Sequence, residues 1–190
     1  MTIIVPYRDR PEHLEKFTAA MRDHTVVVVE QAPSKPFNRG KLINIGFIET
    51  QPAYFCAHDV DMIPIGVDYT PALGVTQLAG SAIQITGYLG GVTMYDTDTF
   101  RFIGGYHNEY FHRAEDNEMA FNLARLQIPV VYRIGTFIDL PHERTGPEFI
   151  PHLWVKAQRP RQIQNQLSIC EYKVLSRHIN GNLTHIIVEI

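Results

Sequence analysis

The chain has 190 residues, of which 45% are hydrophobic and 19% charged, and these proportions are typical of a soluble globular domain. Seventeen Lys and Arg against twenty Asp and Glu give a formal net charge of −3, which argues against nucleic acid as a partner because such partners usually require a basic surface. No apolar run reaches the ~18–20 residues of a membrane span, and no signal peptide pattern is apparent. With only two cysteines, we expect a single cytoplasmic domain over residues 1–190 without a membrane span.

The first third of the chain alternates between predicted strands and helices. Strands are predicted at residues 2–6, 25–30 and 53–57, because each is a short and mostly apolar run. Helices are predicted between them, at residues 11–22 and 39–49, the first of which opens with a proline. This order predicts a parallel α/β sheet with crossover helices.

The remainder of the chain is less regular. Strands are predicted at residues 81–85, 91–95 and 129–134, and a helix at 116–126. The dipeptide at 180–181 is Asn-Gly between two alternating runs, which is a strong signal for a two-residue β-hairpin. We therefore expect the chain to close with an antiparallel ribbon.

Two carboxylates, Asp59 and Asp61, directly follow the third predicted strand. Ligands of open α/β sheets bind beyond the carboxyl ends of the strands. Residues i and i+2 of an extended segment point to the same side, so both carboxylates could approach one hard cation such as Mg²⁺ or Mn²⁺. A capped loop with solvated acids explains the pair equally well.

Arginines stand near two other predicted strand ends. Arg8 and Arg10 follow the first strand, and Phe37, Asn38 and Arg39 open the second helix. Guanidinium groups and helix N-termini are both suited to binding phosphate. Each arginine alone is more often an ordinary surface charge, but two such clusters beside an acidic pair favour a phosphate-containing ligand.

Three later features have both a structural and a functional interpretation. Gly90 and Gly91 form either a tight turn or a place where a ligand approaches the backbone. Glu115 and Asp116 begin an amphipathic helix, where acids ordinarily stabilise the helix N-terminus. His142 follows a predicted strand, and a lone histidine is usually not a ligand.

Five motifs follow one another along the chain: VPYRDRPEHL, FNRGKLINIGF, HDVDMIP, YLGGVTMY and GGYHNEYF…AEDNE, with a His after a later strand. In this order they resemble the β-1,4-galactosyltransferases, which are inverting, metal-dependent enzymes of the GT-A-type fold. The resemblance covers nearly the whole chain. It implies an α/β fold with a mostly parallel central sheet, flanking helices and a C-terminal antiparallel hairpin. It also implies a UDP-sugar donor, Mn²⁺ or Mg²⁺ as cofactor, and a saccharide or glycoconjugate acceptor.

The resemblance also implies a role for each matching residue. Asp61 and His142 would be metal ligands, Glu115 and Asp116 would hold the acceptor sugar, and Asp116 would be the catalytic base. Tyr88 matches a position that favours galactose over N-acetylgalactosamine. The implied donor-binding residues are Pro6, Arg8, Arg10, Phe37, Arg39, Asp59, Val60, Tyr88, Gly90 and Gly91.

The chain departs from the family pattern at three places. Asp139 stands where vertebrate members have Met, so it is either an additional metal ligand, which would favour Mn²⁺ or Mg²⁺, or a solvated side chain. Residues 111–114 replace a Trp-bearing, glycine-rich loop, which leaves the acceptor open. The membrane anchor and stem of the Golgi enzymes have no counterpart, which predicts a minimal soluble catalytic core.

The expected activity is therefore transfer of galactose from UDP-galactose to a sugar hydroxyl with inversion. One alternative is a transferase of the same fold with another UDP-sugar, such as UDP-N-acetylgalactosamine or UDP-xylose, or a nucleotidyltransferase, because only Tyr88 favours galactose. Another is a non-catalytic nucleotide- or carbohydrate-binding module. The Glu115–Asp116 pair argues against such a module, which would need no base.

Overall fold

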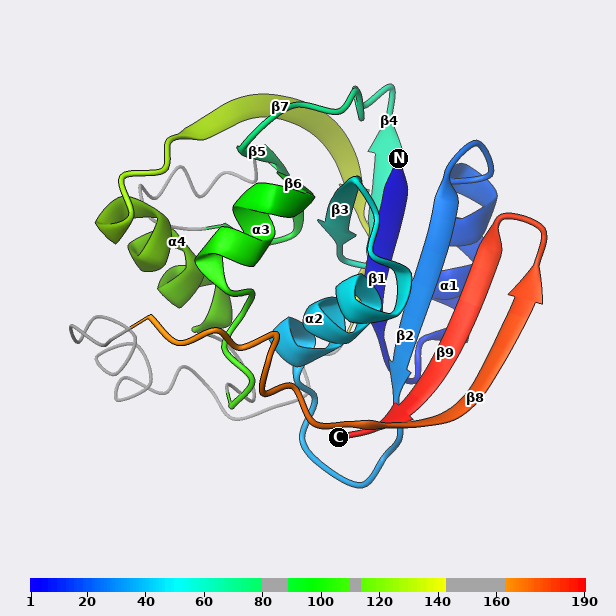
Figure 1. Ribbon diagram of the computed structural model, residues 1–190. Helices are drawn as coiled ribbons and strands as arrows, with labels where there is room; N and C mark the ends of the chain where they lie inside the picture. Colours follow the sequence, from blue (N-terminus) through cyan, green and yellow to red (C-terminus); the bar gives the residue numbers. More distant parts are fainter. Residues whose placement is uncertain (80–88, 110–113, 143–162) are drawn as a thin grey trace.

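The computed structural model describes residues 1–79, 89–109, 114–142 and 163–190 (Figure 1). Within these residues a nine-stranded sheet is flanked by helices. The elements are β1 (Thr2–Tyr7), α1 (Pro11–Ala20), β2 (Thr25–Gln31), α2 (Arg39–Thr50), β3 (Tyr54–His58), β4 (Met62–Ile65), β5 (Val75–Ala79), β6 (Val92–Asp96), α3 (Thr97–Ile103), α4 (Glu115–Arg125), β7 (Val130–Asp139), β8 (Lys173–Asn180) and β9 (Leu183–Glu189).

The N-terminal elements confirm the predicted alternation of strands and helices. β1 pairs in parallel with β2 on one side and with β3 on the other. α1 begins at Pro11, whose missing N–H is not needed in the first helical turn. α2 is capped by Asn38, whose side chain accepts a hydrogen bond from the N–H of Lys41 at 3.0 Å, and it ends at Gln51 in the left-handed conformation.

The sheet is mixed, and it is less parallel than the sequence predicted. Its strand order is β4-β7-β5-β6-β3-β1-β2-β9-β8. Of the eight strand pairings in the described part of the chain, four are parallel and four antiparallel. β6 runs antiparallel to both of its neighbours, β3 and β5, and so interrupts the parallel arrangement.

The C-terminal ribbon is present as predicted. β8 and β9 pair antiparallel with Asn180 opposite Leu183, so the two-residue turn is Gly181-Asn182, one residue later than the predicted Asn180-Gly181. Gly181 has a positive φ of 58°, which is typical of such a turn. β9 also pairs in parallel with β2, so the ribbon extends the central sheet (Figure 1). The predicted strand at residues 81–85 lies outside the described residues.

Hydrophobic side chains are buried on both faces of the central strands, which explains why β1 and β2 are almost continuously apolar. Ile4 packs on the α2 face, whereas Ile3 and Val5 pack on the opposite face. A Cβ atom on Gly46 of α2 would lie 2.5 Å from Cγ2 of Ile4, so this glycine lets the helix approach the sheet closely. No helix in the described residues is long and apolar enough to cross a membrane.

Candidate active site

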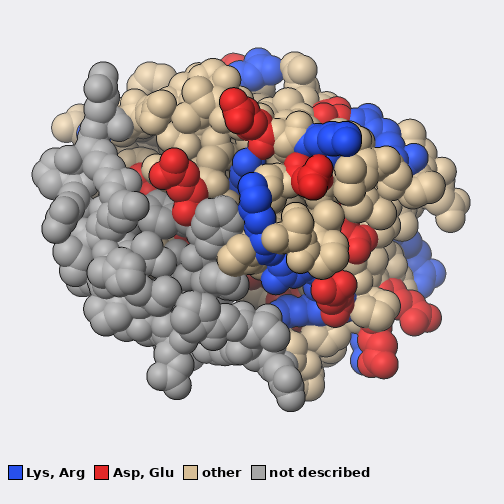
Figure 2. All heavy atoms as spheres, turned by 90° about the horizontal axis from the view of Figure 1, so that it is seen from below, with Lys and Arg blue, Asp and Glu red and all other residues tan. Residues whose placement is uncertain are grey.

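The predicted site residues gather where β1 and β3 end and α2 begins. Figure 2 shows the molecule of Figure 1 from below. On this face a line of Lys and Arg side chains lies among Asp and Glu side chains. β3 ends at His58 and is followed at once by Asp59 and Asp61. β1 ends at Tyr7, whose hydroxyl accepts a hydrogen bond from the N–H of Arg10 at 3.0 Å.

Arg39 connects the predicted donor and acceptor residues. Its Nε donates to Oδ1 of Asp59 at 2.6 Å, and its Nη1 donates to Oδ1 of Asp116 at 2.7 Å. Oε1 of Glu115 lies 3.9 Å from Nη1. The side chain of Arg39 is largely buried, at 11% exposure. One guanidinium therefore lies among three carboxylates, one from the turn after β3 and two from the first turn of α4, and it is hydrogen-bonded to two of them.

Close packing of α2 against α4 makes these contacts possible. Gly40 follows Arg39 at the start of α2, and a Cβ atom there would lie 3.0 Å from Cβ of Tyr106 and 3.3 Å from Cβ of Glu115. A residue with a side chain would push α4 and the preceding loop away from Arg39. Arg39 thus supplies the positive charge at the start of α2, and Gly40 leaves the space that lets α4 come close to it.

The environment of Asp116 favours a proton-accepting role. Burial raises the pKa of this carboxyl well above its usual range, Arg39 opposes the increase, and the negative charges of Glu115 and Asp59 add to it. A carboxylate with a raised pKa is a stronger base than an exposed one. The raised pKa is therefore compatible with the predicted role of Asp116 as a base.

Asp61 and His142 form the second cluster. Oδ2 of Asp61 lies 3.0 Å from Nδ1 of His142 and 3.1 Å from Nη1 of Arg10. The antiparallel pairing of β4 with β7 brings the two segments together, and the N–H of Leu140 donates to the carbonyl of Asp61 at 2.8 Å. Burial raises the pKa of Asp61, and the charge of Asp59 raises it further.

This donor set fits a divalent cation. Nδ1 of His142 and Oδ2 of Asp61 lie 3.0 Å apart, at the distance of a hydrogen bond. Cis ligands at about 2.1 Å in an octahedral site lie about as far apart, so the pair is also compatible with a shared cation. The pair leaves the remaining positions for ligand oxygens and water. Asp139, the predicted third ligand, is exposed, and the described residues contain no group of three or more His, Cys, Asp or Glu side chains placed to hold a metal. The structure thus brings together two of the three predicted metal ligands.

Among the other predicted donor residues, Arg8 and Phe37 lie together. The guanidinium of Arg8 is 5.3 Å from the centre of the Phe37 ring, and its Nη1 donates to the carbonyl of Lys35 at 2.8 Å. Pro6 is buried in β1, two residues before Arg8. This cation–aromatic pair lies next to the end of β1, beside the other predicted donor-binding residues.

Gly90, Gly91 and Val60 contribute to the shape of the site rather than to its polar surface. Gly91 has a φ of 74°, and its carbonyl accepts a hydrogen bond from the N–H of Asp59 at 2.9 Å. The carbonyl of Gly90 accepts from Nε2 of Gln77 at 2.7 Å. Val60 is 4% exposed and packs in the core. Tyr88, the predicted galactose-selecting residue, lies outside the described residues.

The sequence did not point to an amide network beneath the site. Asn44 is fully buried in α2, and its side chain donates to the carbonyl of Tyr106 at 2.6 Å and to Oδ1 of Asn108 at 2.9 Å. Asn108 in turn donates from its backbone and its side chain to Gln166. An asparagine within the apolar helix 39–50 was the available signal, because buried amides require partners.

Comparisons with known proteins show what the chain resembles in sequence and in fold. Residues 1–70 match the family model for the N-terminal region of glycosyl transferase group 7. Human β-1,4-galactosyltransferase 4 is 28% identical over the whole chain, which spans 63% of that relative. Drosophila melanogaster β-1,4-galactosyltransferase 7 is 30% identical over 75% of the chain and 51% of the relative. The chain thus spans less than two thirds of the length of these curated relatives.

A third relative, a β-N-acetyl-D-glucosaminide β-1,4-N-acetylglucosaminyl-transferase of Lymnaea stagnalis, is 30% identical over 79% of the chain and 36% of its own length. Among solved structures, the catalytic domain of Drosophila β-1,4-galactosyltransferase 7 with xylobiose superposes with a TM-score of 0.82 at 23% identity, and covers 100% of this chain and 93% of that one. A mutant of that enzyme with manganese, UDP-Gal and xylobiose gives a TM-score of 0.80 at 24% identity with the same coverage. The chain is therefore similar to the β-1,4-galactosyltransferases and has the GT-A-type fold of their catalytic domain.

Proposed function

We propose that the chain is a metal-dependent, inverting glycosyltransferase that moves galactose from UDP-galactose to a sugar hydroxyl. The observation that carries this proposal is the position of Arg39, which contacts Asp59 of the predicted donor site and Asp116, the predicted base, through one guanidinium. A transferase needs donor and base side by side, whereas a binding module needs no base. The solved relative in complex with manganese and UDP-Gal supports the same conclusion.

Basic residues at the end of β1 would bind the diphosphate of the donor. Arg8 and Arg10 carry the charge that neutralises phosphate oxygens as the sugar–phosphate bond breaks. Asp61 and His142 would hold Mn²⁺ or Mg²⁺, and a divalent cation bound there would supply further stabilisation of the UDP leaving group. Asp59, held by Arg39, would contact the nucleoside.

Glu115 and Asp116 would act on the acceptor. Both come from the first turn of α4, and both are buried beside Arg39. Asp116 would accept the proton of the acceptor hydroxyl as that oxygen attacks the sugar carbon from the face opposite UDP. Inversion needs a single base and no covalent intermediate, and the raised pKa of Asp116 fits that task.

A second candidate function is transfer of N-acetylglucosamine from its UDP derivative. The Lymnaea stagnalis relative, which is named for that sugar, is 30% identical to the chain. Tyr88 is the only residue in the sequence that favours galactose, so the donor is an experimental question. The cytoplasmic location and the lack of a nucleic-acid partner stay predictions from composition.

The test is a panel of UDP-sugars with Mn²⁺, read by UDP release and by formation of the disaccharide or longer product. We expect Asp116→Asn to slow transfer about 10²–10⁴-fold, the usual contribution of a general base, and to leave UDP and Mn²⁺ binding within about twofold by calorimetry. Asp61→Ala should remove the metal dependence of UDP binding. Asp23→Asn, an equivalent change at an exposed acid, should behave as the wild type. Transfer at the wild-type rate by Asp116→Asn would refute the assignment.

A further inference from the structure

His58 is a fully buried histidine at the end of β3, directly before Asp59. Its ring packs edge-on against Phe17 of α1, with ring centres 4.8 Å apart, and against Phe137 of β7, with ring centres 5.8 Å apart. A buried polar side chain needs hydrogen-bond partners. The partners of His58 lie on both sides of the ring, and one of them is the backbone of Asp59 itself.

The hydrogen bonds of the ring determine which nitrogen carries its proton. Nδ1 of His58 lies 2.9 Å from the carbonyl oxygen of Asp59, and Nε2 lies 2.8 Å from the hydroxyl of Tyr69. Burial lowers the pKa of His58 to about 4, so the ring is neutral at pH 7 and has a single N–H. Because a carbonyl can only accept, the proton is on Nδ1, and Nε2 accepts from the hydroxyl of Tyr69.

The carbonyl of Asp59 that accepts this bond also closes the turn that carries Asp61. Residues 59–62 form the turn between β3 and β4, and the N–H of Met62 donates to the same carbonyl at 3.3 Å. The contact from His58, at 2.9 Å, is the shorter of the two. His58 thus holds the first residue of the turn, and Asp61 is the third.

Two backbone hydrogen bonds fix the same turn from other strands. The N–H of Asp59 donates to the carbonyl of Gly91 at 2.9 Å, and the N–H of Leu140 donates to the carbonyl of Asp61 at 2.8 Å. His58 adds a side-chain contact from the core. The direction of the Asp61 carboxylate depends on the backbone of this turn, so a change at His58 reaches that carboxylate without touching it.

We propose that His58 is a positioning residue for the cation site, which acts by holding the carbonyl of Asp59 and thereby the turn that presents Asp61. The proposal rests on the proposed function, because it takes Asp61 as a metal ligand. Replacing a group that orients a metal ligand typically lowers metal affinity about 10–100-fold. His58 needs no contact with the cation to have an effect of that size.

Two substitutions separate this role from ordinary packing in the core. The amide nitrogen of Asn is attached to Cγ, as Nδ1 of His is, so His58→Asn can still donate to the carbonyl of Asp59. The amide nitrogen of Gln lies one bond further out, in the position of Nε2, so His58→Gln can keep only the contact with Tyr69. A residue that merely fills space would tolerate Gln at least as well as Asn, because Gln is closer to His in size.

Calorimetry with Mn²⁺ in the presence of UDP measures the effect on the cation site. We expect His58→Gln to weaken Mn²⁺ binding about tenfold or more, and His58→Asn to stay within about threefold of the wild type. The order of the two variants carries the test, because only Asn reproduces the bond from Nδ1. Equal Mn²⁺ affinities of the two variants would overturn the proposal.

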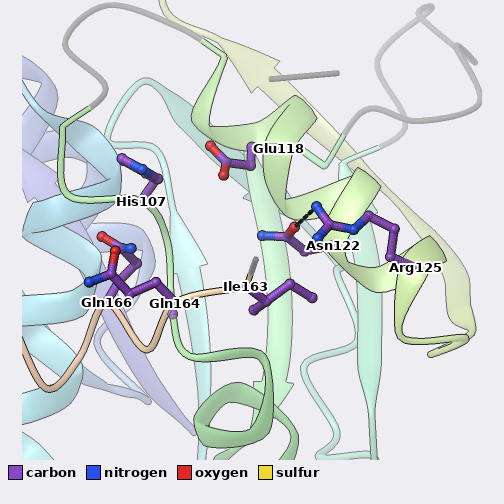
Figure 3. Close-up of a pocket in the computed structure, with 8 residues that line it drawn as sticks. His107, Glu118, Asn122, Arg125, Ile163, Gln164 and Gln166 are labelled. Carbon is purple, nitrogen blue, oxygen red and sulfur yellow. Dashed lines mark hydrogen bonds between the residues drawn. The ribbon is translucent and has the colours of Figure 1, made fainter. Parts of the chain in front are cut away.

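Two control variants should bind Mn²⁺ and UDP as the wild type does. Val28→Ala changes a fully buried position of β2, in the hydrophobic cluster that contains Phe17, and controls for loss of stability. His107→Gln changes a second histidine, which lines a polar pocket of about 140 Å³ beside α4 (Figure 3). Nδ1 of His107 accepts from the N–H of Glu109 at 3.1 Å, so this ring does not donate through Nδ1 to a carbonyl.

NMR tests the same role without metal or donor. Nitrogen shifts of the wild-type ring should show the proton of His58 on Nδ1, and a proton on Nε2 would overturn the proposal. The amide of Met62 should exchange with solvent at least about tenfold faster in His58→Gln, and change by less than about threefold in His58→Asn. Equal exchange at Met62 in the two variants would also contradict the proposal.

Failure of the proposed function would leave a different pattern. A wild type that binds no Mn²⁺ with UDP and transfers no sugar would refute the proposed function, while the ring proton and the exchange at Met62 would still decide whether His58 holds the turn. Mn²⁺ binding and transfer with the ring proton on Nε2 would refute the role of His58 and leave the proposed function standing.

Discussion

Replacing Arg39 with Met should destabilise the protein in a manner that depends on pH. The guanidinium makes contacts of 2.6 Å and 2.7 Å with Asp59 and Asp116 and is 11% exposed. Two unit charges about 4 Å apart attract by about 4 kcal/mol at an effective dielectric constant of 20, and removing one partner of a buried ion pair typically costs about 3–5 kcal/mol. We expect Arg39→Met to lower the free energy of unfolding by about 3–5 kcal/mol at pH 7.5.

The pH dependence follows from the carboxylates that remain. Burial already raises the pKa of Asp116 in the folded protein, and loss of Arg39 raises it further. The folded variant then binds protons that the unfolded chain releases, so its stability falls as the pH increases and recovers as the pH decreases. The deficit of Arg39→Met relative to wild type should therefore be about 2 kcal/mol smaller at pH 5 than at pH 7.5.

Urea unfolding followed by circular dichroism at the two pH values measures this deficit. A double-mutant cycle identifies its source: in the Asp116→Asn background, Arg39→Met should cost at least about 1 kcal/mol less than in the wild type. Arg22→Met, at an exposed position after α1, is the matched control and should change stability by less than about 0.5 kcal/mol. If Arg39→Met lowers the free energy of unfolding by the same amount at both pH values and in both backgrounds, the idea that Arg39 stabilises the ionised carboxylates is refuted.

Two further predictions concern the core beneath the site. His58 is fully buried, Nε2 of its ring lies 2.8 Å from the hydroxyl of Tyr69, and burial lowers its pKa to about 4. The free energy of unfolding should therefore fall by about 2 kcal/mol between pH 7.5 and pH 5. His58→Gln cannot titrate and should show a smaller fall in urea unfolding at the two pH values, and an equal fall would contradict the prediction. Gly46→Ala places Cβ 2.5 Å from Cγ2 of Ile4, so it should lower the free energy of unfolding by about 1–3 kcal/mol and lower the melting temperature. An unchanged melting temperature would show that α2 can move away from the sheet.

The parts of the fold that were predictable are those with a strong local pattern. β1 and β2 were predicted from continuous apolar runs, and α2 from a helical segment between two predicted strands. The β8–β9 hairpin was predicted from Asn180-Gly181, although its turn is Gly181-Asn182. β4 was not predicted, because it has only four residues and contains Pro64. The antiparallel direction of β6 was not predictable either, since strand direction depends on pairing with distant segments and leaves no local signal.

The candidate site was predictable as a set of residues but not as an arrangement. Asp61 and His142 were named as metal ligands, and the structure places them 3.0 Å apart. Arg39 was expected to serve the donor alone, whereas it also contacts Asp116, 77 residues further along the chain. A contact over that separation depends on the packing of α2 against α4, which periodicity does not encode.

The acidic and basic side chains of the two clusters do not balance in number. The described ion pairs of the two clusters join four carboxylates, those of Asp59, Asp61, Glu115 and Asp116, with only two guanidinium groups. With every carboxylate ionised and His142 neutral the formal charge is −2, and buried excess charge of one sign is unfavourable unless a counter-charge arrives or a carboxylate takes up a proton. This excess equals the charge of one divalent cation, and under the proposed function Asp61 and His142 would hold that cation.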